Sequence, residues 1–299
     1  MGKDIALVLS SGSARGLAHI GVIEELEAQG HRITSVAGCS MGALVGGIYA
    51  AGKLQDYREW MKTIDRGRMR DLIDLSFSIN HLVKGERIIE ALMEIVPDVP
   101  IEELPIPYCA VATDWASGRE VVFREGSLFQ AIRASISLPS FFSPVRRDGM
   151  ILIDGGVTNP LPLNRVARRE GDWLVGVDVS GEDYEVKNKI QQEAVERKKK
   201  QKSLSQIIID KLTTEHADFN YFTLLSRSSS IMIRQNSRLM TELMRPDILV
   251  DIEMHNIDSF DYDKSERIIA IGRNKARQAL SAKARAERQE AKHARRQEA

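Results

Sequence analysis

The chain has 299 residues, of which 43% are hydrophobic and 28% are charged, a composition typical of a globular protein with a sizeable core. Its 42 basic residues equal its 42 acidic residues, so the formal net charge is zero and nothing global indicates a nucleic-acid partner. Two cysteines make neither a disulfide framework nor a metal site, and no apolar run approaches the roughly 20 residues of a membrane span. We therefore expect a cytoplasmic protein whose membrane contact, where it has any, is peripheral.

The first fifty residues alternate short apolar runs with segments of helical periodicity. Ile5–Leu9 predicts a strand, and the apolar positions of Leu17–Glu27 recur at helical spacing after a turn. Ile33–Ala37 predicts a second strand, and Met41–Ala51 predicts a helix whose small residues let it lie close against a sheet. This repeated order of strand, turn and helix is typical of a parallel sheet with crossover helices.

The middle of the chain continues this alternation. Residues 54–97 predict mostly helix, and Tyr108–Thr113 predicts a buried strand. Arg119–Phe123 follows across a Ser-Gly turn, so the two segments predict a hairpin. Later elements are a helix at Leu128–Ile136 and strands at Ile151–Ile153 and Trp173–Val179.

The composition changes after Gly181. A polar, charged segment at 182–206 predicts an exposed excursion, which we also consider as a lid, and apolar periodicity returns in 207–225 and 231–244. A late strand is expected at 248–252 and a late helix at 266–280. We therefore expect a core at 4–180, a mainly helical part at 181–280 packed on it, and a charged tail at 281–299.

One short segment has the pattern of a nucleophile turn. Gly38-Cys39-Ser40-Met41-Gly42 fits G-x-S-x-G between a predicted strand and a predicted helix, which is the context that this motif requires. Such a turn projects the serine oxygen from the sheet edge, and the N–H groups at the helix N-terminus suit a developing oxyanion. The alternative is that Ser40 only caps the helix, as serines often do.

A base for this serine is harder to find among the histidines. His216 and His255 lie in polar settings, and a lone histidine at any of the other positions is more often a surface residue than a base; these positions are His19, His31, His81 and His293. Asp154 is different, because it ends a short apolar strand and Gly155-Gly156 leave room for a close approach. The alternative for Asp154 is a turn aspartate that binds its own backbone.

Four stretches in order resemble the patatin-like phospholipases, most closely their small bacterial members. The similarity covers about residues 4–180 and is carried by 14–27 (ARGLAHIGVIEELE), 37–52 (AGCSMGALVGGIYAAG), 134–145 (ASISLPSFFSPV) and 154–162 (DGGVTNPLP), with weaker similarity over RPDILVDIEM and FDYDKSERIIAIGRNKA. The resemblance implies a three-layer α/β/α fold with a central, mostly parallel sheet and a helical C-terminal part. It also implies a dyad without histidine, in which Ser40 is the nucleophile and Asp154 the proton acceptor.

The family forms its oxyanion hole from a glycine-rich loop after the first strand. The corresponding residues here are Gly12, Ser13, Ala14 and Arg15, to which the Met41 N–H is added, and two of the three family glycines are serines. Backbone donors survive such a change, but glycine adopts positive φ readily and serine does not. A dinucleotide fingerprint is a poor alternative for this loop, because its leading glycines are missing.

The resemblance implies hydrolysis of lipid acyl esters, of the phospholipase A or lysophospholipase type, through an acyl-enzyme. Leu138, Phe141 and Phe142 are candidates for an apolar acyl trough, and basic runs at 66–70 or 198–202 for membrane contact. No metal or organic cofactor is implied. Two alternatives remain: a regulatory or scaffolding protein on this fold with weak or no turnover, or an esterase or thioesterase for small soluble acyl esters.

Overall fold

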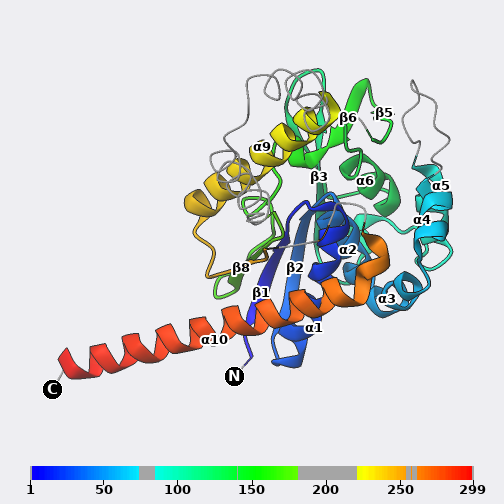
Figure 1. Ribbon diagram of the computed structural model, residues 1–299. Coiled ribbons are helices and arrows are strands. Elements are labelled where there is room, and N and C mark those ends of the chain that lie inside the picture. Colours follow the sequence, from blue (N-terminus) through cyan, green and yellow to red (C-terminus); the bar gives the residue numbers. More distant parts are fainter. Residues whose placement is uncertain are drawn as a thin grey trace, which may run out of the picture.

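The computed structural model describes residues 2–73, 85–139, 141–180, 221–253, 257 and 261–297. Eight strands in these residues form one sheet in the order β5-β6-β3-β2-β1-β7-β8, with β4 also paired to β3 (Figure 1). The strands are β1 (Asp4–Leu9), β2 (Arg32–Cys39), β3 (Tyr108–Asp114), β4 (Glu120–Phe123), β5 (Val145–Arg147), β6 (Met150–Asp154), β7 (Trp173–Asp178) and β8 (Ile248–Asp251).

The sheet is mostly parallel, as predicted. Strands β3, β2, β1, β7 and β8 pair in parallel, while β4 and β6 are antiparallel to β3 and β5 is antiparallel to β6. The hairpin predicted from Arg119–Phe123 is confirmed by the pairing of β3 with β4. Strand β5 was not predicted, because its three residues, Val-Arg-Arg, are too few to show a period of two.

Helices cover both faces of the sheet. Alternation along β1 sends Ile5, Leu7 and Leu9 into the larger core cluster, and Ala6 and Val8 into a smaller one on the opposite face. The larger cluster is built with residues of α1, α2, α6 and α10, and the smaller one packs against α9. The helices are α1 (Ala18–Ala28), α2 (Met41–Ala50), α3 (Leu54–Lys62), α4 (Arg66–Ile73), α5 (Glu86–Met93), α6 (Leu128–Ser135), α9 (Tyr221–Met244) and α10 (Ser265–Gln297). The predicted three-layer α/β/α architecture is confirmed.

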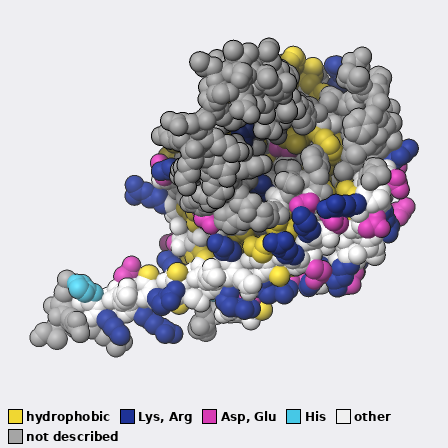
Figure 2. Space-filling view, in the orientation of Figure 1, with side chains coloured by type: hydrophobic (Ala, Val, Ile, Leu, Met, Phe, Trp, Pro, Cys, Tyr) yellow, Lys and Arg dark blue, Asp and Glu magenta, His cyan; other side chains and the backbone are white. Residues whose placement is uncertain are grey.

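The C-terminal part joins the sheet as well as packing on it. It supplies β8 to the sheet edge beside β7, and α10 packs along α1 (Figure 1). The end of α10 projects from the body and exposes mainly charged side chains (Figure 2). The excursion at 182–206 lies outside the described residues, and the domain division stays a prediction. Within the described ranges, no helix combines the length and apolarity that a membrane span requires.

Helices α1 and α10 approach each other at two glycines. A Cβ at Gly21 of α1 would lie 1.9 Å from the Ile269 carbonyl oxygen, and a Cβ at Gly272 of α10 would lie 2.0 Å from the Ala18 carbonyl oxygen. No side chain fits at either position unless a backbone moves. This contact fixes the spacing of the two helices.

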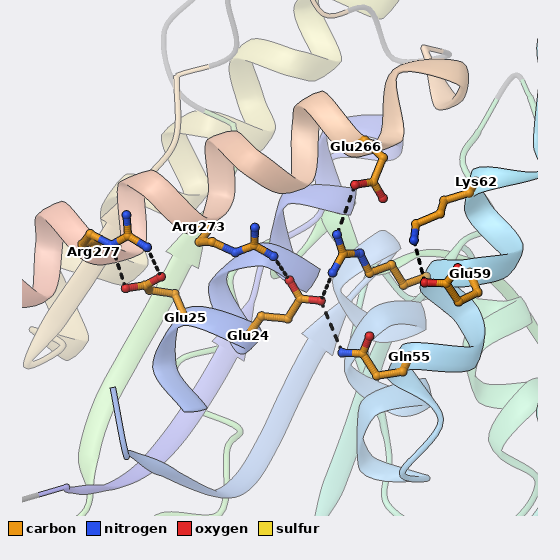
Figure 3. Close-up of polar contacts among 9 residues, drawn as sticks. Glu24, Glu25, Gln55, Glu59, Lys62, Glu266, Arg273 and Arg277 are labelled. Atoms are coloured by element: carbon orange, nitrogen blue, oxygen red, sulfur yellow. Dashed lines mark hydrogen bonds and ion pairs between the residues drawn. The ribbon is translucent and has the colours of Figure 1, made fainter. Parts of the chain in front are cut away.

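Ion pairs extend the same contact (Figure 3). Arg277 of α10 donates two hydrogen bonds to the buried Glu25 of α1, at 3.0 and 2.8 Å. Arg273 pairs with Glu24, which also accepts a hydrogen bond from Arg58 of α3 at 2.8 Å. Because Glu24 is largely buried and held from two sides, the pairs define one register of α10 against α1.

We expect Gly21→Ala and Gly272→Ala each to lower the Tm, because a Cβ within 2.0 Å of a backbone oxygen puts the overpacking cost at about 3 kcal/mol, above the gain in helix propensity of about 1 kcal/mol. Gly67→Ala is the matched control, since Gly67 lies exposed in α4 and its nearest neighbour is the flexible Asp65 carboxylate at 3.3 Å. Differential scanning calorimetry of the three variants measures the difference. A Tm equal to that of the wild type for both core variants would contradict this view of the helix contact.

Candidate active site

Strands β2 and β6 share one edge of β3. Val111 of β3 pairs with Cys39 of β2, and the next residue, Ala112, pairs with Asp154 of β6. Val111 and Ala112 also pair with β4, which occupies the opposite edge. The C-terminal ends of the parallel β2 and the antiparallel β6 therefore face each other along this edge of β3. Ser40, which follows Cys39, lies beside Asp154 between these two strand ends.

Ser40 forms the turn between β2 and α2. Its φ of 55° and ψ of −122° are values that L residues rarely adopt, so the turn is strained. Its side chain makes no capping hydrogen bond to α2. Instead, Ser40 Oγ donates to Asp154 Oδ2 at 2.6 Å. The alternative of a helix cap is therefore wrong, and the strained turn presents the hydroxyl to the carboxylate.

Asp154 is held in one orientation and is almost completely buried, with 3% of its surface exposed. Its Oδ1 accepts a hydrogen bond from the Gly156 N–H at 2.7 Å, which leaves Oδ2 for Ser40. Its backbone is tied to Ser137 and Thr113. Asp154 does bind its own turn, as the turn alternative supposed, but it also binds Ser40.

Burial raises the pKa of Asp154 to about 6 from an ordinary value of 3.8, against the opposing effect of the hydrogen bonds from Ser40 and Gly156. Cys39 contributes to this enclosure, because its buried Sγ lies 4.0 Å from Asp154 Oδ1. Burial, and next the charge of Asp154, also raises the pKa of the Cys39 thiol, so the thiol stays protonated. A carboxyl with a pKa near 6 is a better proton acceptor than an ordinary aspartate.

The loop after β1 lies beside this pair. It continues into the 3-10 helix η1 (Ser13–Leu17), with Gly12 at its N-cap and Ala14 and Arg15 in its first turn. N–H groups in such a first turn lack partners within the helix. Ser13 adopts a positive φ of 48°, so a serine takes the conformation that favours glycine. Of the predicted oxyanion residues, Ser13 and Met41 line the same pocket as Ser40.

Glycines allow the close packing around the pair. A Cβ at Gly42 would lie 2.2 Å from the Leu9 carbonyl oxygen, and one at Gly155 would lie 2.2 Å from that of Val111. Gly38 contacts the Gly42 backbone in the same way. Helix α2 therefore lies directly against β1 and β2.

Ser135 is a site residue that the sequence reasoning missed. Its buried Oγ accepts a hydrogen bond from the Ser40 N–H at 2.8 Å and donates to the Val111 carbonyl at 2.6 Å. Ser135 thereby ties the nucleophile turn to β3 from helix α6. Its only signal was its place in the stretch 134–145, where it is one of four serines.

An apolar pocket opens at Ser40. Leu138, Phe141 and Phe142 line it as expected. The opposite wall was not predicted and comes from α3, α4 and α5. In the sequence, only the helical spacing of its apolar residues could have indicated this wall. These residues are Tyr57, Trp60, Met61, Met69, Leu72, Ile88 and Leu92.

The histidines of the described residues do not reach this pair. His19 is completely buried rather than on the surface, and its Nε2 lies 2.9 Å from the Ser10 carbonyl oxygen. Burial lowers its pKa to about 4, so the ring is neutral and donates to that carbonyl. His31 precedes the N-terminal end of β2, at the opposite end of this strand from Ser40, and His293 lies near the C-terminal end of α10. His81, His216 and His255 lie outside the described residues.

The raised pKa of Asp154 predicts how stability depends on pH. The folded chain holds this proton more tightly than the unfolded chain, so stability falls as pH rises from about 4 to about 6. Above that range the buried charge costs roughly 3 kcal/mol, which Asp154→Asn avoids while it keeps a hydrogen-bonding amide. We expect the Tm of Asp154→Asn to exceed that of the wild type by several degrees at pH 8, and by much less at pH 4. A difference of the same size at both pH values would refute the assignment.

Comparison with known proteins agrees with the resemblance seen in the sequence. The family model for "Patatin-like phospholipase" matches residues 7–167. An NTE family protein of Mycobacterium tuberculosis is 45% identical over 179 residues, which are 60% of this chain and 50% of the relative. Human patatin-like phospholipase domain-containing protein 6 is 33% identical over 189 residues, which are 61% of this chain and 14% of the relative.

The chain thus spans about half the length of the mycobacterial relatives and a small fraction of the animal ones. Among solved structures, VipD from Legionella pneumophila aligns with a TM-score of 0.48 and 16% identity, over 94% of this chain and 67% of VipD. The family model covers Ser40, Asp154 and the loop after β1, and it spans more than half of the chain. The chain therefore belongs to the patatin-like phospholipase family.

Proposed function

We propose that this chain is a serine acyl hydrolase that cleaves acyl esters of lipids, of the phospholipase A or lysophospholipase type. The observation that carries the proposal is the 2.6 Å hydrogen bond from Ser40 Oγ to the buried Asp154, at the opening of an apolar pocket. The family of the chain and the name of its relative in Drosophila melanogaster, neuropathy target esterase sws, agree with ester hydrolysis.

The reaction begins with proton transfer within the dyad. As Ser40 Oγ attacks the ester carbonyl carbon, its proton passes along the existing hydrogen bond to Asp154 Oδ2. The carbon–oxygen bond to the alcohol then breaks, and the alcohol leaves with the proton from Asp154. Water attacks the acyl-enzyme in the same way, its proton goes to Asp154 and then to Ser40 Oγ, and the carboxylic acid is released.

Backbone N–H groups stabilise the negative oxygen that forms in both steps. The proposed donors are those of the loop Gly12-Ser13-Ala14-Arg15 and of Met41, at the N-termini of η1 and α2. Arg15 holds the loop through a hydrogen bond from its Nε to the Ile257 carbonyl at 2.9 Å. This loop is fixed before substrate binds, so it needs little reorganisation during the reaction.

The pocket supports a lipid substrate rather than a small polar ester. Its walls are almost entirely apolar, and Met61 and Leu92, which line it, are 1% exposed. An acyl chain in this pocket removes its methylene groups from water, which contributes about 0.8 kcal/mol for each group buried. The acyl chain supplies the binding free energy, and the dyad at the opening receives the ester carbonyl.

We expect Ser40→Ala and Asp154→Asn to abolish hydrolysis of a medium-chain p-nitrophenyl ester and of a phospholipid, while both variants stay folded by circular dichroism. Because Asp154 must be ionised, wild-type kcat/KM rises with pH to a plateau above about pH 6 and falls tenfold per unit below it. Full turnover by folded Asp154→Asn would eliminate Asp154 as the proton acceptor.

A regulatory or lipid-binding protein with weak turnover is the second candidate. The strained Ser13 in the proposed oxyanion loop favours it, because the φ of 48° costs a serine about 1 kcal/mol more than a glycine. In that case, folded wild-type protein shows no turnover yet retains lipid, and Ser40→Ala leaves lipid binding unchanged. Hydrolysis assays combined with a lipid-binding measurement on the wild type and on Ser40→Ala therefore separate the two candidates.

Acyl-chain selectivity tests the pocket. Leu92→Phe adds bulk to a buried wall residue, so we expect kcat/KM for long-chain esters to fall at least tenfold while short-chain esters are hydrolysed at the wild-type rate. Ile89→Phe is the matched control, because Ile89 lies on the same helix and is not one of the residues that line the pocket. An equal loss for all chain lengths would place the acyl chain elsewhere.

A further inference from the structure

We propose that helix α9 carries a docking surface for membranes that contain anionic phospholipid. This α9 surface consists of two parallel stripes, an exposed apolar one and a basic one beside it. The apolar stripe is Leu224, Ile231, Met232, Leu239 and Leu243, and the basic stripe is Arg227, Arg234 and Arg238. The inference rests on the proposed function only for the biological role of the surface, since an enzyme that cleaves lipid esters must reach a lipid surface.

The apolar stripe is exposed and is not part of the core. Its side chains are 43% to 73% exposed, with Leu243 the most exposed of them. At about 100° per residue, the five positions fall within an arc of roughly 120°. The face on the opposite side is buried: Ser237 is completely enclosed, and Met240 and Met244 pack on the smaller core cluster. Helix α9 is therefore anchored by one apolar face and presents a second.

The arginines give the surface its charge preference. Arg227, Arg234 and Arg238 are spaced seven and four residues apart, so they form a row along one border of the apolar stripe. The helix has one acidic residue, Glu242, which accepts a hydrogen bond from Arg238 at 3.1 Å. A positive excess on α9, in a chain whose net charge is zero, favours an anionic partner.

This combination fits a lipid surface better than a second copy of the chain. A helix that lies in the interface buries its apolar side chains among acyl chains and places its arginines at headgroup phosphates. A symmetric pairing of two α9 surfaces brings the arginine rows of both copies into one interface, with a single glutamate from each copy to offset them. Like charges in such an interface destabilise it.

The position of α9 also connects the surface to the candidate active site. Helix α9 contacts the 3-10 helix η3 (Gly155–Val157), which directly follows Asp154. Within η3, Val157 is 47% exposed, so an apolar side chain reaches solvent three residues from Asp154. A membrane on the α9 surface is thus near the strand ends where Ser40 and Asp154 meet.

The test is vesicle binding by protein with the Ser40→Ala change, which leaves the lipid uncleaved. Sedimentation with vesicles of phosphatidylcholine alone, or with added phosphatidylserine, compares two double variants, Leu239→Ser/Leu243→Ser and Arg227→Gln/Arg234→Gln. We expect the serine variant to bind both vesicles at least tenfold more weakly. The glutamine variant loses about thirtyfold, and only on vesicles with phosphatidylserine.

The matched control removes two arginines elsewhere. Arg285→Gln/Arg288→Gln, on the exposed end of α10, makes the same change in charge and should bind like the parent protein. Both α9 changes are also made in the wild-type background, where hydrolysis of a soluble short-chain ester should be unchanged. This assay separates the inference from the proposed function, because vesicle binding through α9 stands even where no ester is cleaved.

Two outcomes would overturn the inference. One is an affinity for vesicles that is the same for both α9 variants as for the parent protein. The other is a parent protein that binds no vesicles but self-associates in analytical ultracentrifugation, with self-association abolished by Leu239→Ser/Leu243→Ser. That result would make a second copy of the chain the occupant of the α9 surface.

Discussion

The shared edge of β3 is the constraint on which the candidate site depends. Because β2 ends opposite Val111 and β6 ends opposite Ala112, the two strand ends face each other across one residue step. The register of the sheet, rather than the conformation of a loop, therefore places Ser40 beside Asp154. The remaining contacts refine this placement, with Ser135 holding the Ser40 N–H and Gly156 orienting the carboxylate.

Burial of Asp154 has opposite consequences for stability and for chemistry. Removal of the carboxyl from water raises its pKa to about 6, which makes it a stronger base at neutral pH. The same burial disfavours the charged folded state, and the donors Ser40 and Gly156 offset only part of that cost. A strained residue persists only where its surroundings fix the backbone, and here the close contact of Gly42 with β1 and the hydrogen bond from the Ser40 N–H to Ser135 Oγ hold the turn.

Two groups of helices, one on each face of the sheet, lie near the ends of β2 and β6. Helices α3, α4 and α5 close one side with an apolar wall suited to an acyl chain, and α9 lies against η3 on the other face of the sheet. The proposed division is that the pocket selects the acyl chain while α9 brings the protein to the lipid. Both depend on side chains from segments that the family motifs do not include.

The sequence by itself determined the alternation of strands and helices, the parallel sheet and the G-x-S-x-G turn, while the pair Ser40 and Asp154 came from the resemblance of its motifs to the patatin-like phospholipases. These follow from local periodicity, from glycines at tight turns and from motifs whose residues are adjacent in the chain. Only the tertiary structure decided that Ser40 binds Asp154 rather than caps α2, that Ser135 supports it, and that His19 is buried. Strand β5, the pocket wall from α3–α5 and the second apolar face of α9 also emerged only there. The physical reason is that each depends on which distant segments pack together, and a period of two or 3.6 residues records that a side chain is apolar but not what it will contact.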